Sequence, residues 1–489
     1  MISPASYLLA AAQRLDTPAV PFKPLCLALI GTVYALEQLL ALRQLPLYSR
    51  TAPPAALAAH VDAATFDKSQ RYGRHKARYA LLVAAVNTAL TLGFVWGNVY
   101  AWAWSTAATA WVGTRWAGHE IATTALFIPI VSLLRDIPTL PLAYYRNFHL
   151  EEAHGFNKMT RKTFALDWLK ETTLGFAIML PVISALIALI RWAGDSFVAY
   201  TVAFLFAFQI TAMLLYPTLI QPLFNTLVPL PEGALRERIV ALASALKFPL
   251  SKIYVIDGST RSSHSNAYFY GVVPGGNKHI VIFDTLLEKS TPDEIEAVLA
   301  HELGHWAHSD PLKLLLLSQA QIIFTISLFT LAIHNHALFR AFGFNVAQGA
   351  HLPVVVGLEL FQLMLAPCDA LIKFLVNACV RRMEYAADAF AQGLPRPPPT
   401  PSGKKIAAPP AEPAADAAAK KDGWKVPEGL APDAAQAKMP YAALLSRALI
   451  KLHVQNLSSM HHDALYSAYH YSHPTLAERL RALDVRKSE

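Results

Sequence analysis

Residues 291–311 carry the sequence TPDEIEAVLAHELGHWAHSDP, around which the rest of the chain is organised. Thr291 has the properties of a helix N-cap, Pro292 suits the first helical position, and Glu294 completes a capping box. Asp310 and the proline after it interrupt the pattern and are suited to begin the next helix. We therefore expect one helix that begins at Thr291 and holds the centre of this stretch well inside it.

That helix contains the pattern His-Glu-x-x-His, formed by His301, Glu302 and His305. Residues four apart lie one turn above each other on the same helix face, so both imidazoles can reach one zinc ion. Glu302 then lies beside the metal and can take the proton of a water that attacks a peptide carbonyl. A chance occurrence on an ordinary helix is the alternative, and the helix signals around the motif argue against it. The pattern predicts a zinc-dependent endopeptidase with Glu302 as catalytic base.

The composition points to a membrane. Of 489 residues, 54% are hydrophobic and only 16% are charged, whereas soluble domains have about 25% charged residues. Lysine and arginine give a net charge of +8, but they gather in loops between apolar runs, so we expect no nucleic-acid partner. Cys26, Cys368 and Cys379 are too few for a disulfide framework.

Apolar runs long enough to span a bilayer, which takes about 20 residues, occur about seven times. They are residues 24–42, 80–103, 121–143, 174–190, 197–216, 314–333 and 352–375. The start of the chain lacks the pattern of a secretory signal, so we expect the first run to be retained. Basic residues crowd the loops between the first and second runs and between the third and fourth, which places these loops in the cytoplasm. The His-Glu-x-x-His segment falls on the same side.

Between the fifth and sixth runs we expect a small α/β unit. Residues 252–256 and 278–283 have the alternating, β-branched pattern of strands, and 266–273 leads into the second strand through the turn 274–277. A strand beside a metalloprotease helix commonly offers its free edge to an extended peptide. A purely structural hairpin is the alternative, and the sequence favours neither.

A catalytic zinc ion needs a third protein ligand and an open position for water. Glu384 is our candidate, with Asp388 one turn further on the same face, where it can orient a ligating histidine from outside. A solvated acidic pair is the alternative reading. His308 competes as third ligand, but three ligands from consecutive turns of one helix fit a tetrahedral ion poorly.

We divide the chain into six parts. They are 1–220 (membrane helices one to five), 221–311 (zinc domain), 312–380 (membrane helices six and seven), 381–394 (helix of the third ligand), 395–440 (disordered Pro/Ala/Lys-rich insertion) and 441–489 (C-terminal helical part that completes the site). In the last part, His473 and Arg479 are candidates to stabilise the oxyanion of the reacting carbonyl. A salt bridge from Arg479 to Glu384 is an equal alternative.

Several stretches together resemble the type I CAAX prenyl proteases, integral-membrane zinc metallopeptidases that remove the C-terminal tripeptide of prenylated proteins. The stretches are 144–158, 261–271, the His301 motif, Glu384 with Asp388, and 465–479. The resemblance implies seven long helices that form a barrel around an intramembrane chamber, capped on the cytosolic side by the zinc domain.

By the same resemblance one Zn2+ per chain is held by His301, His305 and Glu384. Asn266, Ala267 and Tyr268 would hold the substrate backbone, and His473 and Arg479 would lie near the reacting carbonyl. The expected partners are a peptide or protein substrate, prenylated at its C-terminus, and the lipid bilayer; the oligomeric state stays open. The insertion 395–440 departs from the family pattern.

Two other functions remain open at this point. One is a quality-control metalloprotease that clears damaged membrane proteins. The other is a zinc-binding transporter or channel, in which polar groups such as Glu37, Asn87, His119, Glu120 and Asp136 line a water path. The Ala- and Pro-rich composition is typical of a bacterial protein, so we expect a bacterial inner membrane with the zinc site facing the cytoplasm.

Overall fold

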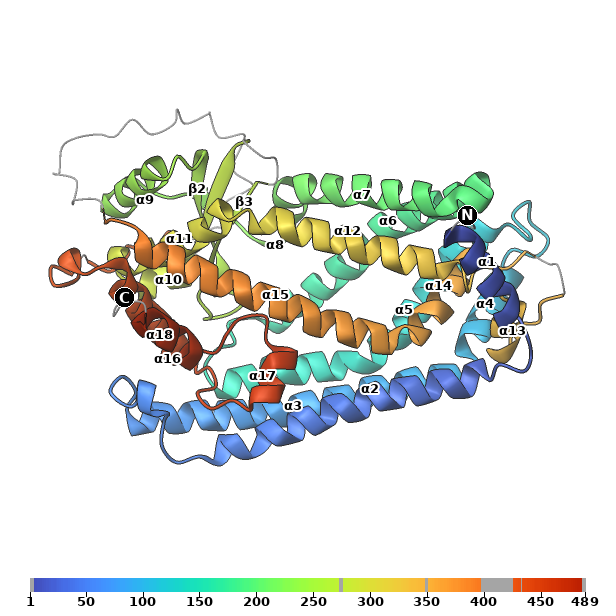
Figure 1. Cartoon of the computed structure of the whole chain (residues 1–489), viewed down its shortest axis with the longest axis horizontal. Coiled ribbons are helices and arrows are strands. Elements are labelled where there is room, and N and C mark those ends of the chain that lie inside the picture. The colour runs from blue at the N-terminus through green and yellow to red at the C-terminus, as the bar shows by residue number, and fades with distance from the viewer. Residues whose placement is uncertain (1–3, 272–275, 348–350, 397–424, 432, 486–489) are drawn as a thin grey trace.

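The computed structural model describes residues 4–271, 276–347, 351–396, 425–431 and 433–485. Figure 1 shows an elongated molecule whose long helices run from a small α/β domain at one end to a group of short helices at the other. The predicted fold class, a helical membrane protein with a small α/β domain, is confirmed.

The long helices account for the seven predicted apolar runs. They are α2 (Phe22–Gln44), α3 (Ala63–Trp96), α5 (Glu120–Tyr145), α6 (Arg161–Ala193), α7 (Phe197–Leu215), α12 (Asp310–Phe329) and the bent pair α14 (Val354–Met364) and α15 (Ala366–Gly393). By length and composition, five stretches of the described residues are able to cross a membrane, or six with the bent pair counted as one. One of these stretches, Arg161–Phe224, contains both α6 and α7. Gly194 separates the two helices with a positive φ of 52°.

Two of the predicted runs are wrong in detail. The run 80–103 is broken, because α3 ends at Trp96 and the chain turns through Asn98, at φ 54°, into α4 (Val99–Thr109). The ammonium group of Lys23 donates to the Trp96 carbonyl (2.8 Å) and to Asn98 Oδ1 (2.9 Å), which stabilises this turn. The run 352–375 bends by 66° between α14 and α15. Pro367 lies in the first turn of α15, where a residue without an N–H group can start a helix but cannot continue one.

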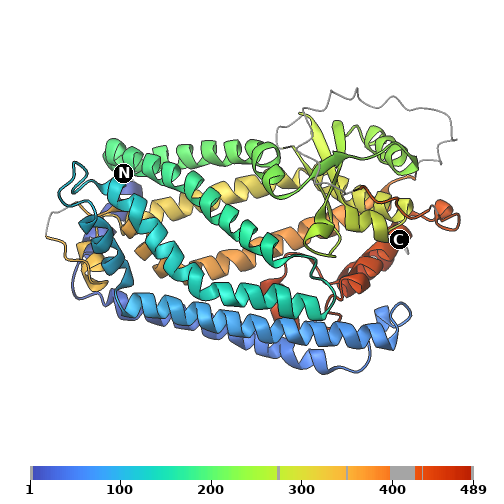
Figure 2. The same cartoon turned by 180° about the vertical axis from the view of Figure 1, so that it is seen from behind.

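The apolar core of the membrane part lies at the end opposite the zinc domain. Its buried residues come from the far ends of the long helices, such as Phe94, Phe127, Phe329 and Val356. Within an apolar 18-residue window of each candidate membrane stretch, only 11–17% of the residues are buried. The helices are therefore packed tightly at the far end, and along most of their length they leave apolar surface uncovered. Figure 2 shows the same arrangement from behind, with α2 and α3 along one side and α7 along the other.

The α/β domain is built on a four-stranded sheet in the order β1-β2-β4-β3. The strands are β1 (Leu227–Pro229), β2 (Leu250–Ile256), β3 (Ala267–Tyr270) and β4 (Lys278–Phe283). β2 runs parallel to β4, whereas β1 and β3 are antiparallel to their neighbours. Both predicted strands are confirmed, and so is the pairing of the segment 266–273 with the second strand. Residues 274 and 275 of the predicted turn 274–277 lie outside the described part of the chain. Five helices share one apolar core with the sheet: α9 (Ala234–Ala245), α10 (Asp284–Lys289), α11 (Pro292–Ala307), α16 (Tyr441–Gln455) and α18 (Leu476–Val485).

The insertion expected at 395–440 falls largely on 397–424 and 432, which lie outside the described residues. The residues at both of its ends belong to the described part of the chain. Arg396 pairs with Asp293 on α11 and donates to the Gln436 carbonyl at 2.5 Å. The Thr291 hydroxyl donates to Gln436 Oε1 at 2.7 Å. The start of α11 therefore binds the segments on either side of the insertion.

Candidate metal centre

Helix α11 presents the His-Glu-x-x-His residues as the sequence predicts. Thr291 accepts from the Glu294 backbone N–H, and the Glu294 carboxylate accepts from the Thr291 backbone N–H at 3.0 Å, so the capping box is complete. α12 begins at Asp310, as expected from the break in the pattern. His301 lies on the buried face, and Glu302 and His305 are half-buried.

Helix α15 crosses α11 at Gly304, inside the motif itself. A Cβ atom at Gly304 would meet Ala387 Cα at 3.0 Å and the Ala387 carbonyl oxygen at 3.1 Å. A residue with a Cβ atom here would require the two helices to separate by a few tenths of an ångström. The close approach carries Glu384, one turn before Ala387, to the two histidines.

The three predicted ligands face one another. His301 Nε2 lies 3.5 Å from Glu384 Oε2, and His305 Nε2 lies 3.3 Å from Glu384 Oε1. Tetrahedral zinc with bonds of about 2.0–2.1 Å separates its ligand atoms by about 3.3 Å, so these spacings fit. Within the described residues, these three side chains are the one group able to hold a metal ion, with donor atoms within 4.8 Å of one another. Two imidazoles and one carboxylate suit zinc.

Each histidine is oriented by a carboxylate on its other nitrogen. His301 Nδ1 lies 2.9 Å from Asp388 Oδ1, and His305 Nδ1 lies 2.9 Å from Asp310 Oδ2. These contacts leave both Nε2 atoms directed at Glu384, which is the arrangement that metal-binding histidines use. Burial opposes a positive charge on His305, but its bonds to Glu384 and Asp310 prevail and raise its pKa to about 9. The site therefore favours positive charge where the metal would lie.

The sequence analysis missed Asp310, which we had assigned only to the start of the next helix. It is five residues after His305, and a turn at Ser309, with φ 57°, brings its side chain back to the imidazole. His308, which competed with Glu384 as the third ligand, does not belong to the group of side chains able to hold a metal ion. It ends α11 and its ring lies against Phe390, 5.8 Å between centroids, rather than with the metal-binding group.

Arg479 on α18 lies behind the ligands. Its Nε and Nη2 donate to the two Asp388 carboxylate oxygens at 2.8 and 2.6 Å, and its Nη1 is 3.6 Å from Glu384 Oε2. The guanidinium thus holds the carboxylate that orients His301. The main partner of Arg479 is therefore Asp388, with the ion pair to Glu384 of the salt-bridge alternative the longer contact, and its place near the reacting carbonyl stays a prediction.

His473 reaches the site from the loop between α17 (Ala464–His470) and α18. Its side chain is 65% exposed, and its Nδ1 lies 2.9 Å from Glu384 Oε2. Arg381, one turn before Glu384, holds both flanks of this loop. It donates to Ser467 Oγ at 3.1 Å on α17 and to the Glu478 carboxylate at 3.0 Å on α18. Nothing in the spacing of the sequence pointed to Arg381.

Glu302 and β3 border one shared space. Glu302 lines a pocket together with Tyr268 and its neighbours on β3, and burial raises the pKa of the Glu302 carboxyl. β3 is the last strand of the sheet, so its outer edge has no partner among the described strands. Asn266 precedes the strand, with Oδ1 accepting from the Ala267 N–H at 2.9 Å. The Tyr268 hydroxyl accepts from Gln221 Nε2 at 2.5 Å, which fixes the ring. Tyr268 thus borders the same pocket as Glu302, and Asn266 and Ala267 directly precede it at the start of this edge strand.

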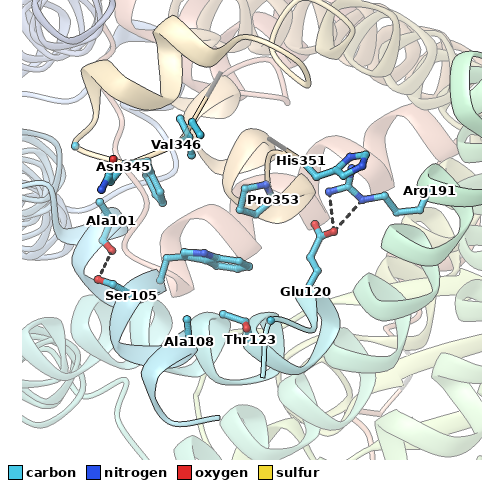
Figure 3. Close-up of a pocket in the computed structure, with 15 residues that line it drawn as sticks. Ala101, Ser105, Ala108, Glu120, Thr123, Arg191, Asn345, Val346, His351 and Pro353 are labelled. Atoms are coloured by element: carbon cyan, nitrogen blue, oxygen red, sulfur yellow. Dashed lines mark hydrogen bonds and ion pairs between the residues drawn. The ribbon is translucent and has the colours of Figure 1, made fainter. Parts of the chain in front are cut away.

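A separate pocket of about 700 Å³ lies at the far end of the helices. Figure 3 shows Glu120 and Arg191 facing each other on its wall. Glu120 also accepts from the Val354 N–H at 2.6 Å, and Arg191 donates to the Leu352 carbonyl at 2.6 Å. Glu120 therefore ties α5 and α6 to the start of α14. The hypothesis of a transporter placed the Glu120 side chain in a water path. In the structure this side chain instead joins helices.

Comparison with known proteins agrees with this site. The family profile described as "CAAX prenyl protease N-terminal, five membrane helices" matches residues 44–226, and "Peptidase family M48" matches residues 229–396. CAAX prenyl protease 1 of Saccharomyces cerevisiae is 36% identical over 486 residues, covering 96% of this chain and 97% of the yeast protein. The CAAX prenyl protease 1 homolog of Arabidopsis thaliana is 36% identical, covering 95% and 98%. The crystal structure of S. mikatae Ste24p aligns with a TM-score of 0.81 at 36% identity, covering 95% of this chain and 99% of that one.

These relatives come from yeasts and a plant, and others of similar coverage come from Homo sapiens and Mus musculus. They are eukaryotic, so the bacterial inner membrane that we expected from composition has no support from them. Alanine and proline content reports on genome composition as much as on the kind of organism, and is a weak guide to the compartment. The fold, the three-ligand group and the full-length similarity agree: this chain belongs to the CAAX prenyl proteases of peptidase family M48, and is a multi-pass membrane metalloprotease.

Proposed function

We propose that this protein is a zinc endopeptidase that hydrolyses peptide bonds near the C-terminus of CAAX-type substrates, including prenylated ones. The observation that carries the proposal is the convergence of His301, His305 and Glu384 beside Glu302 and an open strand edge. The substrate class is that named for the relatives, which match this chain over nearly its full length.

His301, His305 and Glu384 would hold the zinc ion. When bound, zinc supplies a Lewis acid that polarises the peptide carbonyl and makes a water molecule acidic enough to react near neutral pH. Asp388 and Asp310 keep both imidazoles in the tautomer with a free Nε2. Arg479 keeps Asp388 ionised and in place.

Glu302 is the general base in this proposal. Its carboxylate takes a proton from the attacking water and passes it to the departing amine nitrogen, so that the peptide is split into an acid and an amine. The backbone of the substrate pairs with β3 at Ala267 and Tyr268, and Asn266 contacts it at the end of the strand. The exposed imidazole of His473 donates a hydrogen bond to the carbonyl oxygen as negative charge develops there.

We also propose that the metal centre faces the cytoplasm. The segments that join α2 to α3 and α5 to α6, together with the helix ends next to them, carry most of the lysine and arginine residues of the membrane part.

The test compares the purified wild-type protein with Glu302→Gln on two quenched peptides, one farnesylated with a CAAX end and one unmodified. Zinc content is measured on both proteins. We expect wild type to cut, and the zinc-loaded variant to lose at least 100-fold in kcat, since general-base catalysis contributes about 10²–10⁴-fold. The ratio between the two peptides reports the contribution of the prenyl group. Equal rates for two zinc-loaded proteins would contradict the proposal.

A further inference from the structure

The segment 261–266 leads directly into β3, the strand edge proposed to hold the substrate. It is bound on one side to the connection from α5 to α6 and on the other to α10. We propose that Asp167 on α6 and Arg261 are positioning residues, which hold this segment, and through it the edge of β3, in place relative to Glu302. The inference rests on the proposed peptidase function and assigns to it two residues outside the metal centre.

Arg261 and Asp167 form an ion pair between the zinc domain and a membrane helix. Arg261 Nε and Nη2 donate to the two Asp167 carboxylate oxygens at 2.8 and 3.2 Å. The two side chains are 20% and 11% exposed, so solvent and salt screen the pair little. A guanidinium that binds both oxygens of a carboxylate fixes the direction of the contact as well as its length. The pair therefore attaches the start of the segment to α6.

The backbone of the segment is also paired with the connection from α5 to α6. Asn157 and Ser262 form an isolated antiparallel bridge. The backbone N–H groups on either side of this bridge donate across it at 3.2 Å, from Lys158 to Arg261 and from Ser263 to Phe156. The stretch 156–158, which the sequence analysis used only for the family resemblance, thus holds the approach to β3.

A second line of contacts connects the segment with α3. The His264 ring stacks on Phe156, with 4.4 Å between centroids and 17° between planes. His264 Nε2 lies 3.8 Å from Glu151 Oε2. The Glu151 carboxylate accepts from the Tyr72 hydroxyl at 2.9 Å, and Tyr72 on α3 is only 1% exposed. Side chains from three membrane helices or their ends therefore hold this one segment.

On its other side the segment is bound to α10, the helix just before the zinc helix α11. The Thr285 hydroxyl donates to the His264 carbonyl at 2.9 Å, and the Ser265 hydroxyl donates to the Thr285 carbonyl at 3.1 Å. The Asn266 carbonyl accepts from the Phe283 N–H of β4 at 3.1 Å. The segment is thus a joint between the membrane helices and the zinc domain, and Asn266 and β3 begin at its end.

Tyr268 on β3 relates this joint to the reacting groups. It borders the pocket that contains Glu302, and also a second pocket, of about 780 Å³, whose wall includes Asp167 and Arg261. The ion pair therefore acts close to the strand that would hold the substrate, without contacting the metal ligands. Hydrolysis depends steeply on placement, because a displacement of about 1 Å can cost about 10²-fold in rate.

The experiment combines a change in the enzyme with a change in the substrate. Quenched peptides carry an N-methyl group on one backbone amide at a time, on either side of the cleaved bond but not at it. N-methylation removes an N–H group that an extended peptide donates to a strand edge. The N-methylated peptide that the wild type cuts most slowly is the probe of pairing with β3. Full-length Arg261→Gln is compared with wild type on the probe and on the unmodified peptide, with rates expressed per bound zinc.

We expect Arg261→Gln to lower kcat on the unmodified peptide about tenfold, as a displacement of less than about 1 Å would. KM should change less, because the edge of β3 stays available and only its place changes. On the probe the loss should be several times smaller, since that peptide depends less on β3. Arg261→Lys keeps the positive charge but cannot bind both oxygens in the same way, and should lose less than Arg261→Gln.

Arg191→Gln is the matched control, because it removes an ion pair with Glu120 at the opposite end of α6. It should lower the Tm and leave kcat on both peptides unchanged. Partial unfolding slows both peptides by the same factor, so an equal loss on the two peptides in Arg261→Gln would overturn the inference. An unchanged rate in Arg261→Gln, or the same pattern of loss in Arg191→Gln, would overturn it as well.

If Arg261→Gln does not fold, Arg261→Lys decides by the same comparison, and an equal loss on both peptides or no loss at all overturns the proposal. Wild-type rates that no N-methyl group changes would also overturn it, because β3 would then have no part in holding the substrate. In each of these cases cleavage still depends on zinc and Glu302. Failure of the proposed function instead abolishes that dependence.

Discussion

Replacement of Asp310 by asparagine tests the metal centre at a residue that does not itself reach the metal. The Asp310 side chain is 3% exposed, with Oδ2 2.9 Å from His305 Nδ1 and Oδ1 3.0 Å from Lys313 Nζ. Asparagine has almost the same shape but only one acceptor oxygen. If that oxygen faces His305, the amide N–H₂ faces the ammonium of Lys313, and if it faces Lys313, the amide faces the N–H of His305.

Either orientation sets two donors against each other or replaces a charge-assisted bond by a weaker neutral one. Carboxylates that orient metal-binding histidines are worth about 10–100-fold in metal affinity. We therefore expect Asp310→Asn to weaken zinc binding by this factor, which corresponds to about 1.4–2.7 kcal/mol. The loss of kcat should be smaller when zinc is saturating.

The assay is competition for zinc with a chromophoric chelator at fixed pH, together with thermal unfolding of the metal-free protein. The second measurement separates metal affinity from any change at the start of α12. Asp67→Asn is the matched control, because Asp67 pairs with Arg71 on the exposed surface of α3, with its side chain 64% exposed. Wild-type zinc affinity in Asp310→Asn, or an equal loss in the control, would refute the reasoning.

Three other substitutions and one treatment test further parts of the structure. Gly304→Ala should push α15 away from α11 at Ala387, at a cost of about 1–3 kcal/mol, and zinc titration should show weakened binding. Arg381→Gln should lower kcat about tenfold with little change in KM, and should have little effect in a His473→Ala background if it acts by holding the His473 loop. Steady-state kinetics of the double-mutant cycle check this, and additive effects would contradict it. Glu120→Gln should lower the Tm by a few degrees and leave zinc affinity unchanged, because its contacts are at the far end of the helices. Removal of zinc by a chelator should abolish hydrolysis and lower the Tm, since zinc at 100 times its Kd contributes about 2.7 kcal/mol, and added zinc should restore both.

The sequence by itself determined the features that depend on neighbours within a few residues or on the solvent. The capping box at Thr291 is formed within one helical turn, so the start of α11 is predicted correctly. His301 and His305 are likewise one turn apart, and their shared face follows from helix geometry alone. The membrane helices are recognisable because a bilayer requires about 20 consecutive apolar residues, whatever the rest of the fold.

Tertiary structure decided the features that join distant parts of the chain. Glu384 was identifiable as a ligand candidate, but its approach to the histidines depends on Gly304, whose missing side chain matters only because α15 crosses there. Arg381 has its partners more than 80 residues away, on two helices that flank the His473 loop. The turn at Asn98 likewise depends on a contact with Lys23 on another helix. Such pairings are set by how the helices pack, because sequence periodicity reports which face of a helix is buried and not which side chain meets it.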